Sequence, residues 1–290
     1  MLGSANMDLV VRQPRRAEPG ETIFGTGFAT GPGGKGLNQA VAAARAGADV
    51  AFLGAVGDDE FGVRLRARLA ADGIDVAGLL TVDEATGIAA ITVTDDGENS
   101  IVVVPGANAR DELRDADRDA IAGASHLVVQ LERPESLLRE AVAFARARGV
   151  TTVLTPAPAR SGLEELVALA DIIVPNEGEA MLLSGETDAE AAAIALTRTG
   201  ATVVVTRGER GAVVARDGAI AHRVAARRAD AVDTTGAGDT FTGVLVAWLA
   251  AGSAWPEALT AASAAAALAV ARPGAADAAP ARAEILAALA

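Results

Sequence analysis

Cysteine and tyrosine are absent from this chain of 290 residues, and aromatic residues make up only 3% of it. Without cysteine there is no disulfide framework, no cysteine-based metal site and no cysteine nucleophile, which is compatible with a reducing interior. The few aromatic side chains offer little on which a nucleobase could stack. Two histidines, His126 and His222, lie among apolar or basic neighbours without a second ligand at metal spacing, so we interpret both as structural.

Positive charge and long hydrophobic runs are also scarce. The formal net charge is −13, and a field of that sign repels a phosphate backbone. The chain does not start with a basic stretch before an apolar run, and the alanine-rich stretch Ala258–Ala271 is too short to cross a bilayer core of about 30 Å. We therefore expect a cytoplasmic protein with neither nucleic acid nor membrane as a partner. An anionic substrate would have to be held locally, by backbone N–H groups, a helix end or a metal ion.

Strands alternate with helices over most of the chain, which predicts an α/β fold with a doubly wound, mostly parallel central sheet covered by helices on both faces. Ligands of such sheets bind beyond the carboxyl ends of the strands, where each polar motif described below falls. The expected strands are Val50–Val56, Leu127–Gln130, Thr151–Leu154, Ile172–Val174, Thr202–Thr206 and a hairpin of Ala212–Arg216 with Ala219–Val224. The expected helices are Gly36–Ala46, Phe61–Ala71, one from 111, Pro134–Arg148, one from Glu177, one before Thr202, and three near 237–251, 256–271 and 281–289.

Two stretches interrupt this alternation. Thr86–Thr94 and Ser100–Val104 are β-branched runs joined by an Asp-Asp-Gly-Glu-Asn turn, which is typical of a β-hairpin. Residues around 9–32 are rich in Gly and Thr and lack a helical period. We expect these stretches to form a small β-sheet appendage.

The strongest chemical signal is the loop Asp233–Phe241, which directly precedes a long apolar helix. Gly236 and Gly238 let the backbone aim successive N–H groups at one point, and the helix start adds partial positive charge, so the loop is suited to bind phosphate. Asp239 is either an acid at the N-cap or in the first turn of this helix, or a catalytic base. A carboxylate beside a phosphate site is otherwise electrostatically unfavourable, which favours the base.

A second glycine-rich cluster spans Gly31–Gln39. Its G-x-G-x-x-G spacing fits a dinucleotide fingerprint, but no strand directly precedes it and no acidic residue closes a following strand. It also fails as a Walker A loop, because Gly36 stands where Ser or Thr would bind magnesium. Lys35 and Asn38 together offer donors and acceptors, so we expect this cluster to recognise sugar hydroxyls.

Other polar residues follow predicted strands and leave two interpretations open. Asn6 and Asp8 come after the first strand, where such residues either cap a turn or bind a ligand. Glu132 ends another strand and either caps the helix that follows or joins the site. Asn176 and Glu179 open a helix, and this carboxylate either complements the helix dipole or holds magnesium through water.

Taken together, these motifs resemble those of the PfkB (ribokinase-like) carbohydrate kinases. The resemblance runs from Gly3 to about Pro280, and its specificity comes from the order of motifs that are each weak alone. The motifs are Gly3–Asp8, Gly33–Ala40, Pro105–Ala109, Gln130–Glu132, Pro156–Ala159, Pro175–Glu177, Thr206–Gly208 and Asp233–Asp239.

The resemblance implies a single kinase domain, 1–290, with a β-sheet lid formed by segments around 9–32 and 86–106, and a homodimer in which the lids clasp. Asp239 would be the catalytic base, and the backbone of Gly236, Ala237 and Gly238 would form the anion hole. The sugar would be held by Asn6, Asp8, Gly34, Lys35, Asn38 and Glu132. The nucleotide side would consist of Asn176, Thr206, Gly208, Gly211, Gly236 and Gly238, with Glu179 holding Mg²⁺ through water.

The resemblance also implies a monovalent-cation site, for K⁺, next to the anion hole. Its members would be Asp233 and Thr235 together with backbone near Ala269, Arg272 and Gly274. Ala278 stands where serine is frequent in the family, and Pro32 stands where a larger apolar residue is frequent. The first strand is short because the chain begins almost at Gly3, which leaves open a start upstream of Met1.

The implied reaction is ATP-dependent phosphorylation of the primary hydroxyl of a small sugar, with D-ribose to D-ribose 5-phosphate as the first candidate. The same chemistry on deoxyribose, a ketohexose or a nucleoside is the alternative, although Asp8 and Lys35 favour a hydroxyl-rich sugar. The intact Asp239 loop disfavours a non-catalytic sugar-binding homologue. A dinucleotide-dependent oxidoreductase is disfavoured because the glycine-rich cluster lacks the preceding strand and the later acidic residue of a dinucleotide fingerprint.

Overall fold

The computed structural model describes residues 1–290, and its centre is a six-stranded sheet. Four strands pair in parallel, and a hairpin adds two more strands to one edge by antiparallel pairing, so the mostly parallel doubly wound sheet predicted from the sequence is confirmed. In spatial order the strands are β12 (Ala219–Val224), β11 (Ala212–Arg216), β10 (Thr202–Thr206), β9 (Ile172–Ile173), β8 (Thr151–Thr155) and β7 (His126–Gln130).

The first residues of the chain extend this sheet. Leu2 pairs in parallel with Val129 of β7 on one side and with Leu53 on the other. Leu53 directly precedes β3 (Gly54–Gly57), which pairs in parallel with β4 (Leu79–Val82). The segment at Leu2 therefore joins the six-stranded sheet to the β3–β4 pair, and the polar residues after it emerge at the carboxyl end of β7.

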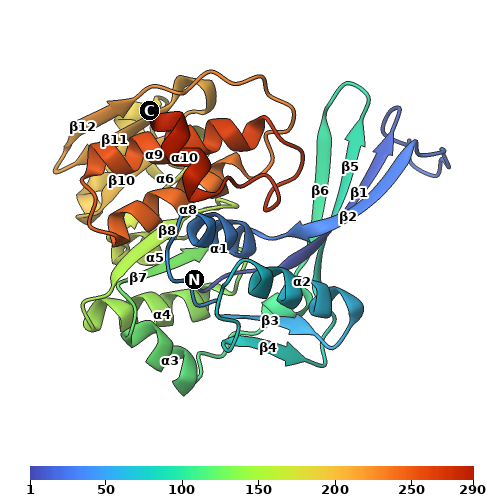
Figure 1. Ribbon diagram of the computed structural model, residues 1–290, viewed down its shortest axis with the longest axis horizontal. Coiled ribbons are helices and arrows are strands. Elements are labelled where there is room, and N and C mark those ends of the chain that lie inside the picture. Colours follow the sequence, from blue (N-terminus) through green and yellow to red (C-terminus); the bar gives the residue numbers. More distant parts are fainter.

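Helices cover both faces of the central sheet (Figure 1). Alternate residues of each strand point to opposite faces, so Val128 packs with one helical layer whereas Leu127 and Val129 pack with the other. The first layer contains α1 (Lys35–Arg45), α8 (Ala237–Ala250), α9 (Trp255–Val270) and α10 (Arg282–Leu289). The second contains α3 (Asp115–Ala122), α4 (Glu135–Ala147), α5 (Glu164–Leu169), α6 (Glu177–Ser184) and α7 (Ala189–Leu196). No helix has the length and apolar character that crossing a membrane requires.

A separate four-stranded sheet projects from this body, at the right of Figure 1. The segments expected around 9–32 and 86–106 pair with each other in it, because β1 and β5 run side by side in parallel over eight residue pairs. Its spatial order is β2 (Gly27–Gly33), β1 (Asn6–Gln13), β5 (Gly87–Thr94) and β6 (Asn99–Val104). A third apolar cluster lies at its base, where Met7 of β1 packs with Leu37 of α1 and with Leu65 of α2 (Glu60–Ala71).

The main differences from the expected elements concern short segments. The strand expected at Val50–Val56 is reduced to isolated bridges at Ala51 and Leu53 followed by β3. The helix expected from 111 begins at Asp115, after a 3-10 turn at Gly106–Ala109. The sequence pattern predicts neither β4 nor α5, because four to six residues are too few to show a period. Two further 3-10 turns, Thr197–Thr199 and Gly208–Arg210, flank β10.

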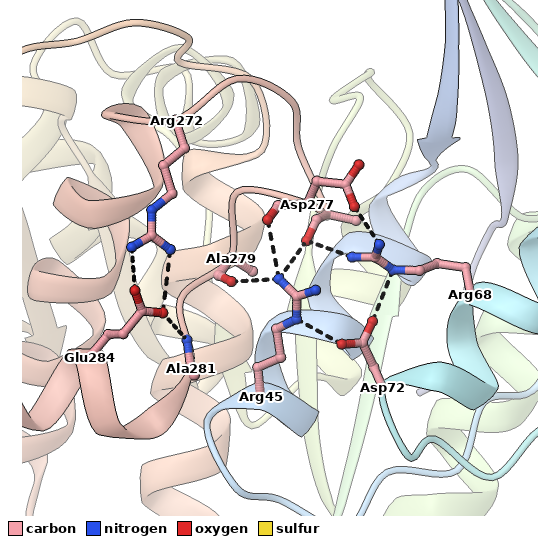
Figure 2. A network of polar contacts seen from close by, with 9 residues as sticks. Arg45, Arg68, Asp72, Arg272, Asp277, Ala279, Ala281 and Glu284 are labelled. Carbon is pink, nitrogen blue, oxygen red and sulfur yellow. Dashed lines mark hydrogen bonds and ion pairs between the residues drawn. The ribbon is translucent and has the colours of Figure 1, made fainter.

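A network of polar contacts ties the segment after α9 to α1 and α2 (Figure 2). Arg45 of α1 donates to the backbone carbonyls of Ala276, Asp277 and Ala279 at 3.4, 3.2 and 2.7 Å. Its Nε also donates to Asp72 Oδ1 at 2.7 Å, while the other oxygen of Asp72 lies 2.9 Å from Arg68 Nε. Arg68 contacts Asp277 as well. One nitrogen of Arg45, Nη1, thus lies within hydrogen-bond distance of three carbonyls of a segment that has no regular secondary structure.

We expect Arg45→Ala to lower the free energy of unfolding by about 2–3 kcal/mol, because it removes charge-assisted bonds to partly buried carbonyls. Arg272→Ala is the matched control. Arg272 pairs with Glu284 in the same view, but that pair is largely exposed, so its loss should cost less than about 1 kcal/mol. Urea unfolding of both variants measures the difference. Equal losses would contradict the role given to Arg45.

Candidate active site

The loop before α8 brings glycine and aspartate together as the sequence suggested. Gly236 has φ of 73°, in the left-handed region, and precedes Ala237, the first helical residue. A Cβ at Gly236 would lie 2.8 Å from the Cβ of Ala275, so only glycine fits between the loop and the segment 274–278. The N–H of Ala237 donates to the carbonyl of Thr234 at 3.3 Å, whereas the N–H groups of Gly238 and Asp239 have no hydrogen-bond partner and are free to bind an anion.

Asp239 lies in this first turn, but it does not cap the helix. Its side chain is buried, and its two oxygens accept from the side chains of α1: Oδ2 from Asn38 Nδ2 at 3.0 Å and Oδ1 from Gln39 Nε2 at 2.9 Å. The N-cap interpretation is therefore wrong, although Asp239 is an acid of the first helical turn. The carboxylate is instead held by two neutral donors that fix its orientation.

Charges around Asp239 act in opposite directions on its pKa. Burial raises the pKa of Asp239, whereas the positive charge of Lys35 and the bonds from Gln39 and Asn38 lower it; the net direction is upward. Burial lowers the pKa of Lys35, but the carboxylates of Asp239, Glu132 and Glu179 more than offset this, so Lys35 stays protonated. The ammonium group is thus the positive centre of a cluster of acids.

Asn6 and Asp8 lie at the start of β1, facing the same cluster. Burial, followed by the charges of Glu132 and Asp239, raises the pKa of Asp8 to about 7. A Cβ at Gly33, in the neighbouring strand β2, would lie within 2.3 Å of the Asp8 carboxylate, so Gly33 makes room for it. Asn6 Oδ1 accepts from Asn108 Nδ2 at 2.8 Å. Its position is therefore set by a side chain from a distant loop rather than by its own turn.

Glu132 connects three segments of the site. Its carboxylate accepts from the Ser4 hydroxyl and, at 3.0 Å, from the backbone N–H of Lys35, the first residue of α1. The helix α4 that follows Glu132 has no side-chain cap. The interpretation that Glu132 caps this next helix is therefore wrong, because it caps α1 and joins the cluster. Gly34, with φ of 92°, leaves no room for a side chain beside the backbone of Asn6.

We expect Asp8→Asn to stabilise the protein at alkaline pH. The pKa of Asp8 is about 7 in the folded state and 3.8 is its ordinary value, so the unfolded chain loses this proton first, and stability falls from about pH 4 to pH 7 and is level above that. Asn carries no charge, so its advantage over the native residue should grow between pH 5 and pH 7 by up to about 2.7 kcal/mol and stay constant up to pH 8.5. Thermal melts without sugar measure this. Asp95→Asn, in the exposed β5–β6 turn, should show no such growth, and equal behaviour of both variants would contradict the prediction.

A pocket of about 880 Å³ opens against the start of α8. Thr206, Gly208 and Gly211, the residues assigned to the nucleotide side, line it together with Ala237 and Gly238. The apolar part of its lining includes Phe241, Ala266, Ala267 and Val270. A Cβ at Gly238 would meet nothing within 4 Å, so the backbone of this residue borders open space. The volume and the mixed lining suit a nucleotide-sized ligand.

Asn176 and Glu179 form a reciprocal cap at the start of α6. Glu179 Oε2 accepts from the Asn176 N–H at 2.8 Å, and Asn176 Oδ1 accepts from the Glu179 N–H at 2.9 Å. Asn176 also pairs with Thr206, which places α6 beside the pocket. Burial raises the pKa of Glu179, and the charges of Lys35 and Asp239 are close enough to act on it. The cap function is thus established, and one carboxylate oxygen, Oε1, has no backbone bond in it.

The structure brings together the residues proposed for a monovalent cation. Asp233 accepts from the N–H of Thr235 through Oδ1 and from the N–H of Gly274 through Oδ2, both at 2.9 Å. Ala269 and Arg272 are joined by a backbone bond at 3.0 Å in the same turn. Ala278 is buried and contributes no hydroxyl. Carboxylate and carbonyl oxygens are the donors that such an ion prefers, so the residues present fit it.

Sequence reasoning missed Ser4, Gln39 and Asn108 as parts of the site. All three are buried polar residues inside motifs already singled out by their order. Ser4 bonds Glu132, Gln39 bonds Asp239 and Asn108 bonds Asn6. A polar residue within an apolar, glycine-rich stretch was the available signal, but its partner lies about a hundred or more residues away in the chain.

The chain belongs to the pfkB family of carbohydrate kinases, whose family model matches residues 1–282. It is 41% identical over 295 residues to the ribokinase of Haemophilus influenzae, with 99% of this chain and 96% of that protein covered. It is 37% identical over 254 residues to a deoxyribokinase of Salmonella typhi, covering 84% and 82%. The structure of Arabidopsis thaliana ribokinase complexed with ribose and ATP superimposes with a TM-score of 0.92, at 32% identity and 99% and 97% coverage. The family and the fold expected from the motifs are confirmed.

Proposed function

We propose that this protein is an ATP-dependent sugar kinase that phosphorylates D-ribose at its primary hydroxyl to give D-ribose 5-phosphate. One observation carries the proposal: Asp239 is a buried carboxylate in a helix turn whose preceding residues, Ala237 and Gly238, line a nucleotide-sized pocket. The carboxylate itself faces a polar cluster on the other side. The ribokinases among its relatives, including one complexed with ribose and ATP, support this choice of substrates.

The reaction follows from this arrangement. Asp239 takes the proton of the sugar hydroxyl while the oxygen of that hydroxyl attacks the γ-phosphorus. The bond from phosphorus to the bridging β-phosphate oxygen then breaks, and ADP leaves. A positioned base contributes roughly 10²–10⁴-fold. The amides of Gly236, Ala237 and Gly238 stabilise the negative charge on the group in transfer, and one such donor is worth about 10²–10³-fold. Phosphoryl transfer needs little else beyond in-line positioning.

The polar cluster supplies the sugar pocket. Asp8, Glu132 and Asn38 offer oxygen acceptors to hydroxyl groups, and Lys35 and Asn6 offer donors. Asn38 Oδ1 is buried and has no partner, which leaves one acceptor free for a ligand. Gly34 keeps the backbone close to the sugar. This set of five polar side chains around one small volume suits a ligand with several hydroxyl groups better than an apolar one.

Two ions complete the proposed site. Mg²⁺ bound with ATP would neutralise phosphate charge, and Glu179, with Asn176 behind it, would hold it through water. K⁺ would bind at Asp233, Thr235 and the carbonyls of Ala269, Arg272 and Gly274. That position lies directly behind Gly236, so the cation would order the amides of the anion hole.

The projecting four-stranded sheet would act as a lid over the sugar, within a single domain. Asp8 and Asn6 belong to its strand β1, so closing the sheet would bring these side chains onto the ligand and exclude water. Its edge strand β6 exposes Ile101, Val102, Val103 and Val104, between 43% and 65% each. We propose that a second copy of the chain covers them, and sedimentation velocity of Val102→Lys, expected to shift toward monomer, tests this.

The test of the function is an ADP-release assay over a panel of sugars, with and without potassium. We expect D-ribose to be turned over best, and turnover to fall without potassium. Deoxyribose is the second candidate, because a relative of this chain is named deoxyribokinase. Strong turnover of a ketohexose or a nucleoside, together with no turnover of ribose, would overturn the choice of sugar. If no compound of the panel leads to ADP release, a non-catalytic sugar-binding homologue would be favoured.

A further inference from the structure

Asp239 depends on a side chain that is completely buried and belongs to no ligand pocket. Gln39 has no exposed surface, and its Nε2 donates to Asp239 Oδ1 at 2.9 Å and to Thr155 Oγ1 at 3.3 Å. The nearby Asn38 bonds the other oxygen of Asp239 and borders the sugar cluster. Gln39 therefore contacts the base from behind, on the side of the central sheet.

The orientation of the Gln39 amide is fixed by a second glutamine. Gln130, the last residue of β7, donates from Nε2 to Gln39 Oε1 at 2.7 Å. Because this donor occupies the oxygen of Gln39, the nitrogen must face Asp239. Gln130 is itself confined, since a Cβ at Gly3 would lie 2.4 Å from its Oε1. Two successive hydrogen bonds, from Gln130 to Gln39 and from Gln39 to Asp239, thus connect the end of a core strand to the carboxylate.

We propose that Gln39, oriented by Gln130, is a positioning residue for the catalytic base: it fixes the rotation of the Asp239 carboxylate and keeps it ionised for proton transfer. The inference rests on the proposed function, because it assigns Asp239 as the base. A carboxylate that accepts only one bond could rotate and turn either oxygen toward the acceptor hydroxyl. With Gln39 and Asn38 both bound, one rotamer remains and its free lone pairs have a defined direction.

The charged groups around Asp239 make a neutral donor necessary at this position. Lys35 faces it from α1, Glu132 from the end of β7, Asp8 from β1 and Glu179 from α6. The three other acids and burial all favour a protonated Asp239, and one ammonium group opposes them. Donation from Gln39 favours the ionised form without adding a charge that would compete for the phosphate.

The experiment compares Gln39→Met, Gln130→Met and the double variant with Gln13→Met. Methionine keeps the length of glutamine and removes its donor. We expect Gln39→Met to lower kcat about 10–100-fold, with the sugar KM within threefold, and to move the acidic limb of the pH profile upward by about one unit. Gln130→Met should shift both in the same direction but less. Gln13, the remaining glutamine of the chain, is the last residue of β1 and lies far from the cluster, so its variant should match the native protein.

The double variant separates positioning from general packing. Since Gln130 acts through Gln39, the double variant should be no slower than Gln39→Met alone. Additive losses, or a slower kcat with an unmoved pH profile, would overturn the proposal. Gln39→Glu adds a further check, because glutamic acid donates only while protonated. Its activity should fall as pH rises, and an activity that rises with pH as in the native protein would count against the inference.

A readout without turnover keeps this inference apart from the choice of substrate. The ¹³C signal of the Asp239 carboxyl group, identified by its loss in Asp239→Asn, can be titrated in the absence of sugar and nucleotide. Its midpoint should move to higher pH in Gln39→Met. An unmoved midpoint would refute the role of Gln39 even in an active ribose kinase. A moved midpoint would support it even if the sugar panel selects another acceptor.

Discussion

Asp239→Asn is expected to lower kcat roughly 10²–10⁴-fold. Asparagine is nearly the same size but cannot take a proton from the sugar hydroxyl. ATP affinity should stay within about threefold, because Ala237 and Gly238, not the Asp239 side chain, line the pocket. Steady-state ADP release and a nucleotide-binding titration by calorimetry measure the two quantities on the same preparation.

Asp119→Asn is the control for this variant, since Asp119 is exposed on α3 and distant from the site. Its kcat should equal that of the native protein. A kcat of Asp239→Asn within tenfold of the native value would remove Asp239 from the role of base. Loss of nucleotide binding in that variant would instead place the carboxylate in the pocket.

Gly236→Ala is expected to lower kcat about 10²–10³-fold, because it disturbs the amides that face the phosphate. The new methyl group would lie 2.8 Å from the Cβ of Ala275, and φ of 73° is strained for alanine. The loop must therefore shift away from the segment 274–278. Unfolding free energy should also fall by about 1–3 kcal/mol.

Gly252→Ala separates the effect of backbone strain at positive φ from the effect of a steric clash of the new methyl group. Gly252 follows the far end of α8 with φ of 83°, and a Cβ there would meet nothing within 4 Å. This variant should lose stability through the backbone alone and keep its kcat. Equal kcat values for the two variants would show that the position of the Gly236 amide does not govern the transfer.

The long elements and the order of motifs were predictable from the sequence. The hairpin Ala212–Arg216 with Ala219–Val224 was placed to the residue, and the glycines at 236 and 238 located the start of α8. These signals are local, because turn residues and apolar periods lie within one segment. The family followed from motif order and is confirmed over residues 1–282.

The partners of each polar side chain were not predictable in the same way. Glu132 caps a helix that starts 97 residues earlier, and Asp239 is held by a side chain 200 residues away. Such pairs depend on how strands and helices pack, which no local pattern encodes. The structure shows how the proposed sugar, nucleotide and cation residues lie near one another, and their roles stay predictions.

Strand β6 has a consequence for how the protein behaves on dilution. It is an edge strand with unpaired backbone groups, and four consecutive apolar side chains on it are largely in contact with solvent. Such an edge either associates or adheres to surfaces. We expect the specific activity to stay constant at micromolar protein and to decline at low nanomolar protein, with albumin restoring it only where adsorption rather than dissociation is the cause.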